Sequence, residues 1–316
     1  MRVLVTGGAG YVGGWLVDEL VTARHDVRVF DSLLYEDLYL KDVPFFFGDV
    51  TDLSAIKPHL AWADVVVFLA GFVGDPLCAL NPKHTMRVNV DAVRQLIDNF
   101  DGQIVFPSTC SVYGAQTGEL TEESPVAPLS LYAETKLTAE RLLLQRKAPT
   151  LIFRLGTLFG LSDTYSRIRV DLVLNVLSVR AVLEKKMSVF GGSQYRPLLH
   201  VRDVATATTP WIGKDVSGVF NLHTENLKIS DLAQRVQRVV SDAEIELTSS
   251  SFQDARNYMV SSKKAEQELE FKPRFSIEDG IHEIVSLVQS RRIKNVNLPR
   301  FSNVAAMAPL IGESQR

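Results

Sequence analysis

Tyr132 and Lys136 stand four residues apart in a stretch that the sequence predicts to be helical. At this spacing two side chains lie on one face of a helix. An ammonium beside a phenol favours the phenolate, so the pair predicts a tyrosine pKa below its ordinary value of about 10. A tyrosine activated in this way is a suitable base for hydride chemistry on an alcohol or a ketone.

A glycine-rich turn, TGGAGYVG over residues 6–13, follows a predicted strand over residues 1–5 and precedes an amphipathic helix. Glycines let the backbone turn tightly and approach a pyrophosphate, which then lies at the helix N-terminus. A second predicted strand, residues 27–30, ends at Asp31, about 20 positions past the glycines, where an acid can bind the adenine-ribose hydroxyls. Asp31 would repel a 2′-phosphate, so NAD is favoured over NADP; the alternative is a solvated acid in a turn.

The elements that position these residues alternate between strands and helices through the first half of the chain. This order predicts right-handed βαβ units and a doubly wound parallel sheet of the Rossmann type, with a smaller mixed α/β lobe. One strand, over residues 103–106, delivers Thr109 at its carboxyl end, the edge at which ligands bind in such sheets. The predicted division is a dinucleotide-binding domain over 1–155, to which parts of 196–225 return, a substrate lobe over 156–290 and a C-terminal tail over 291–316.

The composition is that of an ordinary globular enzyme, with 46% hydrophobic and 22% charged residues among 316. A net charge of −3 gives no reason to expect nucleic acid or a membrane surface as a partner. Cys78 and Cys110 predict no disulfide framework, and no Cys/His cluster has metal-ligand spacing. The first core strand begins at Arg2 and no apolar run reaches about 18 residues, so a cytoplasmic protein is expected.

Residues 1–290 resemble the extended short-chain dehydrogenase/reductases, in particular the nucleotide-sugar epimerases and dehydratases. The resemblance rests on TGGAGYVG, on the Tyr132/Lys136 pair, on STCSVYG over 108–114 and on Asn89 as a structural asparagine. It implies NAD as the cofactor and a homodimer built through the helices near 90–100 and 132–146. The cofactor-binding residues that it implies are Gly7, Gly10, Tyr11, Val12, Gly13, Asp31, Asp49, Val50, Leu69, Ala70, Gly71, Ser108, Tyr132 and Lys136.

The resemblance also implies a catalytic trio and a set of substrate-binding residues. The catalytic residues are Thr109, Tyr132 and Lys136. The substrate-binding residues are Thr109, Thr157, Asn175, Arg196 and Arg256. Two arginines suit a nucleotide diphosphate, because guanidinium groups bind phosphate oxygens bidentately.

Several of these assignments have a plain structural alternative. Arg196 could form a surface ion pair, and the same holds more strongly for Arg256. Asn175 either contacts substrate or caps and packs. Arg167 and Arg169 either form an entrance to the anion site or lie on a solvated face.

The leading hypothesis is an NAD-dependent epimerase that acts at C4 of a nucleotide-linked hexose through a transient 4-keto sugar. Dehydratases of the resembled family carry an Asp-Glu pair where this chain has Cys110 and Ser111, and decarboxylases want a Glu at the Ser111 position. The alternative enzyme is a nucleotide-linked 4-keto-sugar reductase. A dinucleotide sensor without catalysis is a remote alternative, because sensors of this fold usually lack the tyrosine or the lysine. Thr157, where the family usually has Asn, departs from a galactose-type 4-epimerase.

Overall fold

The computed structural model describes residues 1–163, 165–248 and 257–307, and at its centre is a seven-stranded parallel sheet. The order of the strands is β11-β7-β5-β4-β1-β2-β3, and neighbouring strands all pair in parallel. Their bounds are β1 Arg2–Thr6, β2 Asp26–Asp31, β3 Phe45–Phe47, β4 Val65–Phe68, β5 Gln103–Thr109, β7 Thr150–Leu155 and β11 Gly218–Leu222. The order reverses between β1 and β4, so a crevice opens where the carboxyl ends of these two strands diverge.

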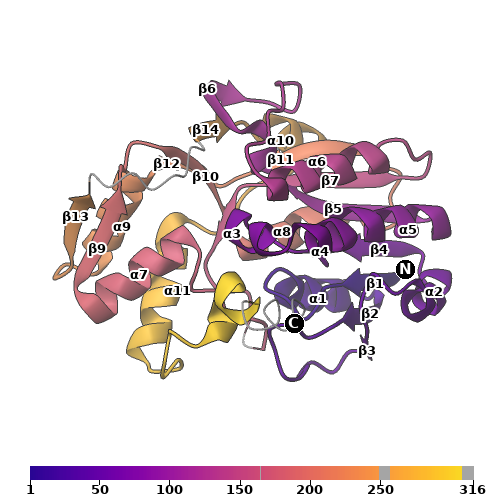
Figure 1. Ribbon diagram of the computed structural model, residues 1–316, viewed down its shortest axis with the longest axis horizontal. Coiled ribbons are helices and arrows are strands. Elements are labelled where there is room, and N and C mark those ends of the chain that lie inside the picture. Colours follow the sequence, from indigo (N-terminus) through magenta and orange to yellow (C-terminus); the bar gives the residue numbers. More distant parts are fainter. Residues whose placement is uncertain (164, 249–256, 308–316) are drawn as a thin grey trace.

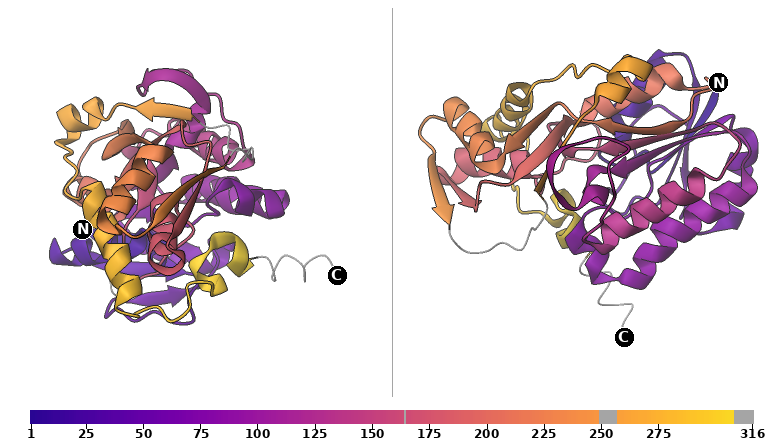
Figure 2. Two further views of the ribbon diagram at one scale, coloured as in Figure 1. Left: turned by 90° about the vertical axis from the view of Figure 1, so that its left-hand side faces the viewer. Right: turned by 90° about the horizontal axis from the view of Figure 1, so that it is seen from above.

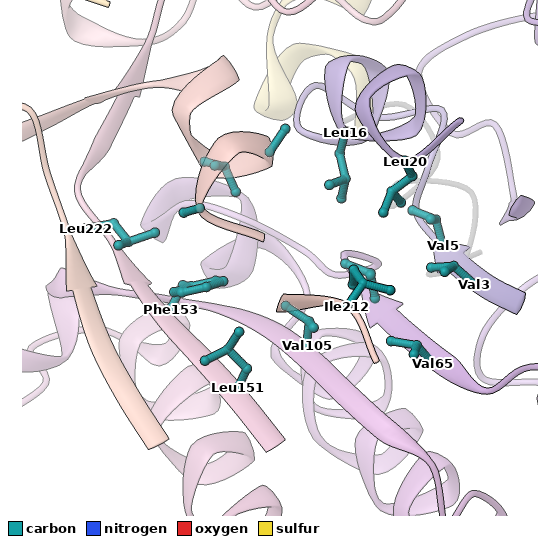
Figure 3. Close-up of a cluster of buried hydrophobic side chains, with 14 of the residues drawn as sticks. Val3, Val5, Leu16, Leu20, Val65, Val105, Leu151, Phe153, Ile212 and Leu222 are labelled. Carbon is teal, nitrogen blue, oxygen red and sulfur yellow. The ribbon is translucent and has the colours of Figure 1, made fainter. Parts of the chain in front are cut away.

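Helices cover both faces of this sheet (Figure 1). One face is covered by α1 (Gly13–Thr22), α8 (Val201–Thr208) and α10 (Lys263–Leu269), whose apolar side chains form one cluster with the strands (Figure 3). The other face is covered by α2 (Leu53–Trp62), α5 (Ala92–Asn99) and α6 (Leu131–Leu143). All four residues of β4 are buried, as expected for a strand that is covered on both faces. The predicted doubly wound fold is confirmed.

The smaller lobe lies beside the carboxyl edge of the sheet (Figures 1 and 2). It contains a three-stranded sheet, β12 (Glu225–Lys228), β10 (Tyr195–His200) and β8 (Thr157–Phe159), and a parallel pair, β13 (Glu244–Thr248) with β9 (Lys186–Phe190). Its helices are α7 (Val173–Glu184), α9 (Ile229–Val239) and α11 (Ile277–Gln289). A further parallel pair joins β6 (Ala115–Leu120) to β14 (Asn257–Val260). The remaining short helices are α3 (Asp75–Leu80), α4 (Pro82–Met86), η2 (Cys110–Tyr113), η3 (Thr209–Trp211) and η4 (Pro299–Phe301).

The helical segment over residues 82–99 contains a π-helical turn, η1 (Arg87–Asp91), between α4 and α5. Asn89 lies in this turn with its side chain buried. Its Oδ1 accepts from Phe72 N at 2.8 Å, and its Nδ2 donates to Phe72 O at 3.0 Å and to Thr135 Oγ1 at 3.1 Å. Asn89 thereby ties the loop after β4 to α6, and π-helical turns are frequent at functional sites.

The predicted C-terminal tail is packed against the protein in its described part, residues 291–307. Phe301, Asn303 and Met307 are buried, and Val170 N donates to Phe301 O at 3.0 Å. In Figure 1 this yellow segment returns from α11 towards α1. The spacing of Phe301, Val304 and Met307 by three residues was the signal of a packed face that the sequence contained. Residues 308–316 lie outside the described part.

Candidate active site

A cavity of about 980 Å³ occupies the crevice at the carboxyl ends of β1, β2, β4 and β5. The loops that follow these strands form one part of its wall. The smaller lobe contributes Thr157 of β8, Arg196 of β10 and the start of α7, and the C-terminal segment contributes Ser302 to Val304. The cavity is therefore continuous from the glycine-rich turn to the smaller lobe.

The glycine-rich turn has the form that a dinucleotide requires. Gly7 has a φ of +71°, and a Cβ there would lie 2.7 Å from the backbone nitrogen of Ala70. Gly10 lines the cavity, whereas Gly13 does not; Gly13 begins α1 and lets the helix pack directly against the backbone of Gly8. The turn thus leads into the N-terminus of α1, whose free N–H groups favour an anion.

Asp31 lies at the end of β2 and lines the cavity. Its Oδ2 accepts from Ala9 N at 3.0 Å and its Oδ1 from Leu33 N at 2.8 Å. Each oxygen keeps a further lone pair, so ribose hydroxyls can still donate to it. Burial raises the pKa of Asp31, against the lowering effect of these backbone N–H groups.

The other residues of the predicted cofactor site also line this cavity, namely Tyr11, Val12, Asp49, Val50, Leu69, Ala70, Gly71 and Ser108. The hydroxyl of Tyr11 donates to Gly160 O at 2.6 Å, which joins the glycine-rich turn to the segment after β8. The residues present fit a dinucleotide, because the glycine-rich turn can bind its pyrophosphate and Asp31 can bind a ribose.

Tyr132 and Lys136 lie one turn apart on α6 and both face the cavity. The helix begins after Ser130, whose hydroxyl accepts from Ala133 N at 3.3 Å and donates to Asp75 Oδ1 at 2.6 Å. Thr109, the residue that ends β5, lines the same cavity, and its side chain acts to lower the pKa of Tyr132. The fold thus brings the three predicted catalytic residues together, although β5 and α6 are separated in the sequence.

The protonation of this trio differs from the simple expectation of an acidic tyrosine. Burial raises the pKa of Tyr132, and burial lowers the pKa of Lys136 to about 8. Lys136 Nζ donates to Pro107 O at 2.9 Å and lies 4.4 Å from the centre of the Phe106 ring. Since the strongest influence on both groups is desolvation, the four-residue spacing alone does not produce a phenolate. Positive charge inside the cavity lowers the pKa of Tyr132, and Arg169 already acts in that direction.

The predicted substrate-binding residues do not all reach the cavity. Thr157 and Arg196 line the cavity, and Arg196 is buried, with Nη1 donating to Tyr195 O at 2.8 Å. Asn175 does not reach the cavity. It is 0% exposed on α7, its Oδ1 accepts from Gly160 N at 3.0 Å, and its Nδ2 donates to Arg169 O at 2.7 Å. Asn175 therefore packs and supports the backbone, the structural alternative. Arg256 lies outside the described residues.

The cavity also contains residues that the sequence did not assign. Arg167 and Arg169 line it, which excludes a solvated face for them, and Ser302 to Val304 come from the predicted tail. Tyr258 of β14 lies 3.4 Å from Ser111 Oγ, in hydrogen-bond contact, and both line the cavity. Long-range packing brings these residues to the site.

Two other site classes find no support in the described residues. No group of three or more His, Cys, Asp or Glu side chains there could hold a metal ion. None of the helices in the described part is long and apolar enough to cross a membrane.

The parallel sheet, the glycine-rich turn at its switch point and Asp31 at the end of β2 define a Rossmann-type dinucleotide-binding protein. The family model "NAD dependent epimerase/dehydratase family" matches residues 3–222. The chain belongs to this family, and NAD, the expected cofactor, is the cofactor of the family.

Curated relatives with different activities are about equally similar to the chain. It is 28% identical to "Uncharacterized UDP-glucose epimerase YtcB" of Bacillus subtilis, covering 92% of this chain and 98% of the relative. It is 26% identical to UDP-glucuronic acid decarboxylase 1 of Arabidopsis thaliana, covering 92% of this chain and 70% of the relative. Among solved structures, UDP-glucose 4-epimerase of Thermotoga maritima with UDP-glucose has a TM-score of 0.82 at 22% identity. The match covers 92% of this chain and 99% of that structure. The fold and the family are thus shown, and the relatives act on nucleotide sugars with more than one chemistry.

Proposed function

We propose that this protein is an NAD-dependent nucleotide-sugar epimerase that inverts C4 of a hexose. The observation that carries the proposal is that Thr109, Tyr132 and Lys136 line one cavity, with Lys136 one helical turn from Tyr132, and that this cavity continues to Arg196. A hydroxyl and a phenol held together can share one sugar oxygen, while an arginine farther along the cavity binds a diphosphate.

In this proposal Tyr132 takes the proton of the C4 hydroxyl and returns it after the sugar has turned over. Thr109 hydrogen-bonds the same oxygen and orients it, and Lys136 holds a ribose of the dinucleotide and contributes positive charge beside Tyr132. NAD, when bound, supplies the hydride acceptor and donor. Proton transfer by a positioned side chain contributes about 10²- to 10⁴-fold to rate.

The segment after Thr109 argues against elimination and decarboxylation. Cys110 is fully buried, its Sγ donates to Arg154 O at 3.2 Å, and burial raises the pKa of its thiol. Ser111 lines the cavity, but it is a hydroxyl and not an acid. Asp75 is the carboxylate whose charge raises the pKa of Tyr132, and it accepts a hydrogen bond from Ser130 at the start of α6. The acid that those reactions need next to the threonine is therefore not supplied by this segment.

The test uses protein purified without added cofactor. Bound dinucleotide is released and identified, and the protein is then incubated with UDP-, GDP-, dTDP- and CDP-hexoses while NMR follows inversion at C4. We expect retained NAD and a C4 epimer with at least one substrate. A variant with Tyr132→Phe should lose about 10²- to 10⁴-fold in rate and keep its bound NAD, whereas Tyr165→Phe, at an exposed tyrosine, should behave as wild type.

Two results would overturn the proposal. Consumption of added NAD(P)H only with a 4-keto sugar would make the protein a reductase. Dinucleotide binding without turnover, with Tyr132→Phe unchanged in every respect, would make it a sensor.

We also propose a homodimer through the surface of α5 and α6. Leu144, directly after α6, is 51% exposed, and Ile97 and Leu142 line a shallow hollow between the two helices. Sedimentation velocity tests this: Leu144→Glu should shift a dimer towards monomer, whereas Leu183→Glu, at an equally exposed leucine of α7, should not. A monomeric wild type would refute it.

A further inference from the structure

Arg167 is a buried cation that forms no ion pair with a carboxylate of the described residues. Arg167 is 4% exposed. Its Nε donates to Arg300 O at 3.3 Å, and its buried Nη2 has no hydrogen-bond partner. No carboxylate of the described residues forms an ion pair with it: Asp171 pairs with Arg169, and Glu36 pairs with Arg300. Burial lowers the pKa of Arg167 to about 10. An unpaired buried guanidinium is costly, so an anion is expected beside it.

The position of Arg167 indicates which anion this is. Its guanidinium lies 3.4 Å from the centre of the Tyr35 ring, in the loop that follows Asp31. The preceding residue, Ser166, packs so closely on Gly14 in the first turn of α1 that a side chain at Gly14 would clash with it. Ser162 of the same segment accepts from Trp15 N at 2.9 Å. Arg167 thus lines the cavity near the N-terminus of α1, where the helix also favours negative charge.

The neighbouring arginines of the cavity are placed differently. Arg169 forms two hydrogen bonds to Asp171, at 2.9 and 3.0 Å, and its charge acts on Tyr132. Arg196 comes from β10 of the smaller lobe. Arg169 also lies near the glycine-rich turn, 6.0 Å from the centre of the Tyr11 ring, but it is paired with Asp171. Arg167, beside Tyr35, has no such ion pair among the described residues.

The C-terminal segment over 299–304 holds Arg167 in this position. Arg300 accepts from Arg167 through its carbonyl and pairs with Glu36 through its side chain. Asn303 N donates to Asp171 Oδ2 at 2.8 Å, and Asn303 Nδ2 donates to Val73 O at 2.7 Å. The segment therefore connects the loop after β2 to the loop after β4, across the cavity that they border.

We propose that Arg167 binds a phosphate of the dinucleotide and that the C-terminal segment positions its guanidinium for this contact. The inference rests on the NAD dependence of the family and not on the C4 reaction. It makes the last turns of the described chain part of the cofactor site, so that retention of NAD depends on residues outside the sheet and its glycine-rich turn.

The test compares the binding of NAD, ADP-ribose, ADP and adenosine to NAD-depleted protein by calorimetry. A hydrogen bond to a charged group predicts that Arg167→Met weakens the three phosphate-containing ligands about 10- to 100-fold and leaves adenosine unchanged. Arg167→Lys should lie between, because it keeps the charge and loses the fork of donors. The control is Arg146→Met, since that half-buried guanidinium donates to Phe100 O, Gly102 O and Thr150 Oγ1 and does not line the cavity.

Distinct results would overturn the inference. Equal weakening of adenosine and ADP would mean that Arg167 acts only by packing on Tyr35. Unchanged binding of NAD, ADP-ribose and ADP in Arg167→Met would show that Arg167 contacts no phosphate of the dinucleotide. Melting curves of each variant verify folding, and the conservative Arg167→Lys keeps the test informative if Arg167→Met is unstable.

Asn303→Ala in the full chain tests the positioning role of the C-terminal segment, because it removes the hydrogen bond from Asn303 Nδ2 to Val73 O. We expect weaker binding of NAD and ADP by about 3- to 10-fold, again with adenosine less affected, and a smaller additional effect of Arg167→Met in this variant. A variant that binds ADP as tightly as wild type would show that the segment does not position Arg167. All these readouts are binding constants, so they stand or fall separately from epimerisation.

Discussion

Arg154 and Arg167 are buried to nearly the same degree, 6% and 4% exposed, but their surroundings are opposite. Arg154 Nη2 donates to Glu140 Oε2 at 2.8 Å, and its Nη1 donates to the hydroxyl of Tyr113 at 2.9 Å. Its pKa is raised by Glu140, against the effect of burial. Arg167 has a lowered pKa, no carboxylate partner among the described residues and a wall of the cavity beside it.

Arg154 is therefore a structural cation, whereas we infer that Arg167 binds a ligand. The network around Arg154 is complete: Ser108 Oγ donates to Glu140, and the Tyr113 hydroxyl donates to Asn221 Oδ1 at 2.8 Å. It ties β5, α6, β7 and β11 together directly behind Thr109 and so keeps the catalytic segment in place. A charge that the chain leaves unpaired at a cavity is instead a reason to expect function there.

The largest effect is expected where the structural pair is broken. Glu140→Gln leaves the Arg154 charge buried and unpaired, so the free energy of unfolding should fall by about 3–5 kcal/mol. Urea denaturation measures this, with Glu134→Gln at an exposed position of the same helix as the control. The double variant Glu140→Met/Arg154→Met should recover much of the loss. A loss below about 1 kcal/mol in Glu140→Gln would contradict the structural role of the pair.

A smaller change in the free energy of unfolding, of opposite sign, is expected at Lys136, another buried cation of the cavity. Because its folded pKa is about 8 against an ordinary 10.5, the unfolded chain binds more protons between these values. Stability of the ligand-free protein should therefore rise as pH increases from 8 to 10.5, and the cost of burying the charge is fully present below pH 8.

Lys136→Met should accordingly stabilise the ligand-free protein by about 1–2 kcal/mol at pH 7. The gain should vanish near pH 10.5, where the lysine is neutral in both states. Denaturation curves at several pH values measure the difference. A pH-independent difference would show that the ammonium is not destabilising.

The smallest effect is expected at Arg167 without ligand. Arg167→Met should change the free energy of unfolding by less than about 1 kcal/mol, because it removes an unpaired charge together with one hydrogen bond and a ring contact. Saturating NAD should then stabilise wild type more than the variant, as ligand linkage requires when affinity is lost. Destabilisation as large as that of Glu140→Gln would erase the distinction between the two arginines.

The sequence was sufficient for the features that depend on local spacing. The strand–glycine–helix opening, Asp31 at the end of β2, Thr109 at the end of β5 and the Tyr132/Lys136 spacing were all readable, and the fold around them is confirmed. The sequence left the role of Asn175 open, because a polar residue on an apolar helix faces either a ligand or the backbone of a neighbouring segment. Only the contacts of Gly160 and Arg169 distinguish the two.

What the sequence alone determined is the order of its elements and the residues at strand ends and on helix faces, since these follow from periods of two and 3.6 residues. Tertiary structure decided burial and pairing. It raised the pKa of Tyr132 through desolvation and placed Asn303 in hydrogen-bond contact with Val73. It also paired Arg154 with Glu140, whereas Arg167 has no ion pair with a described carboxylate. These outcomes depend on segments far apart in the chain, because the electrostatic state of a group is set by everything packed around it and not by its neighbours in sequence.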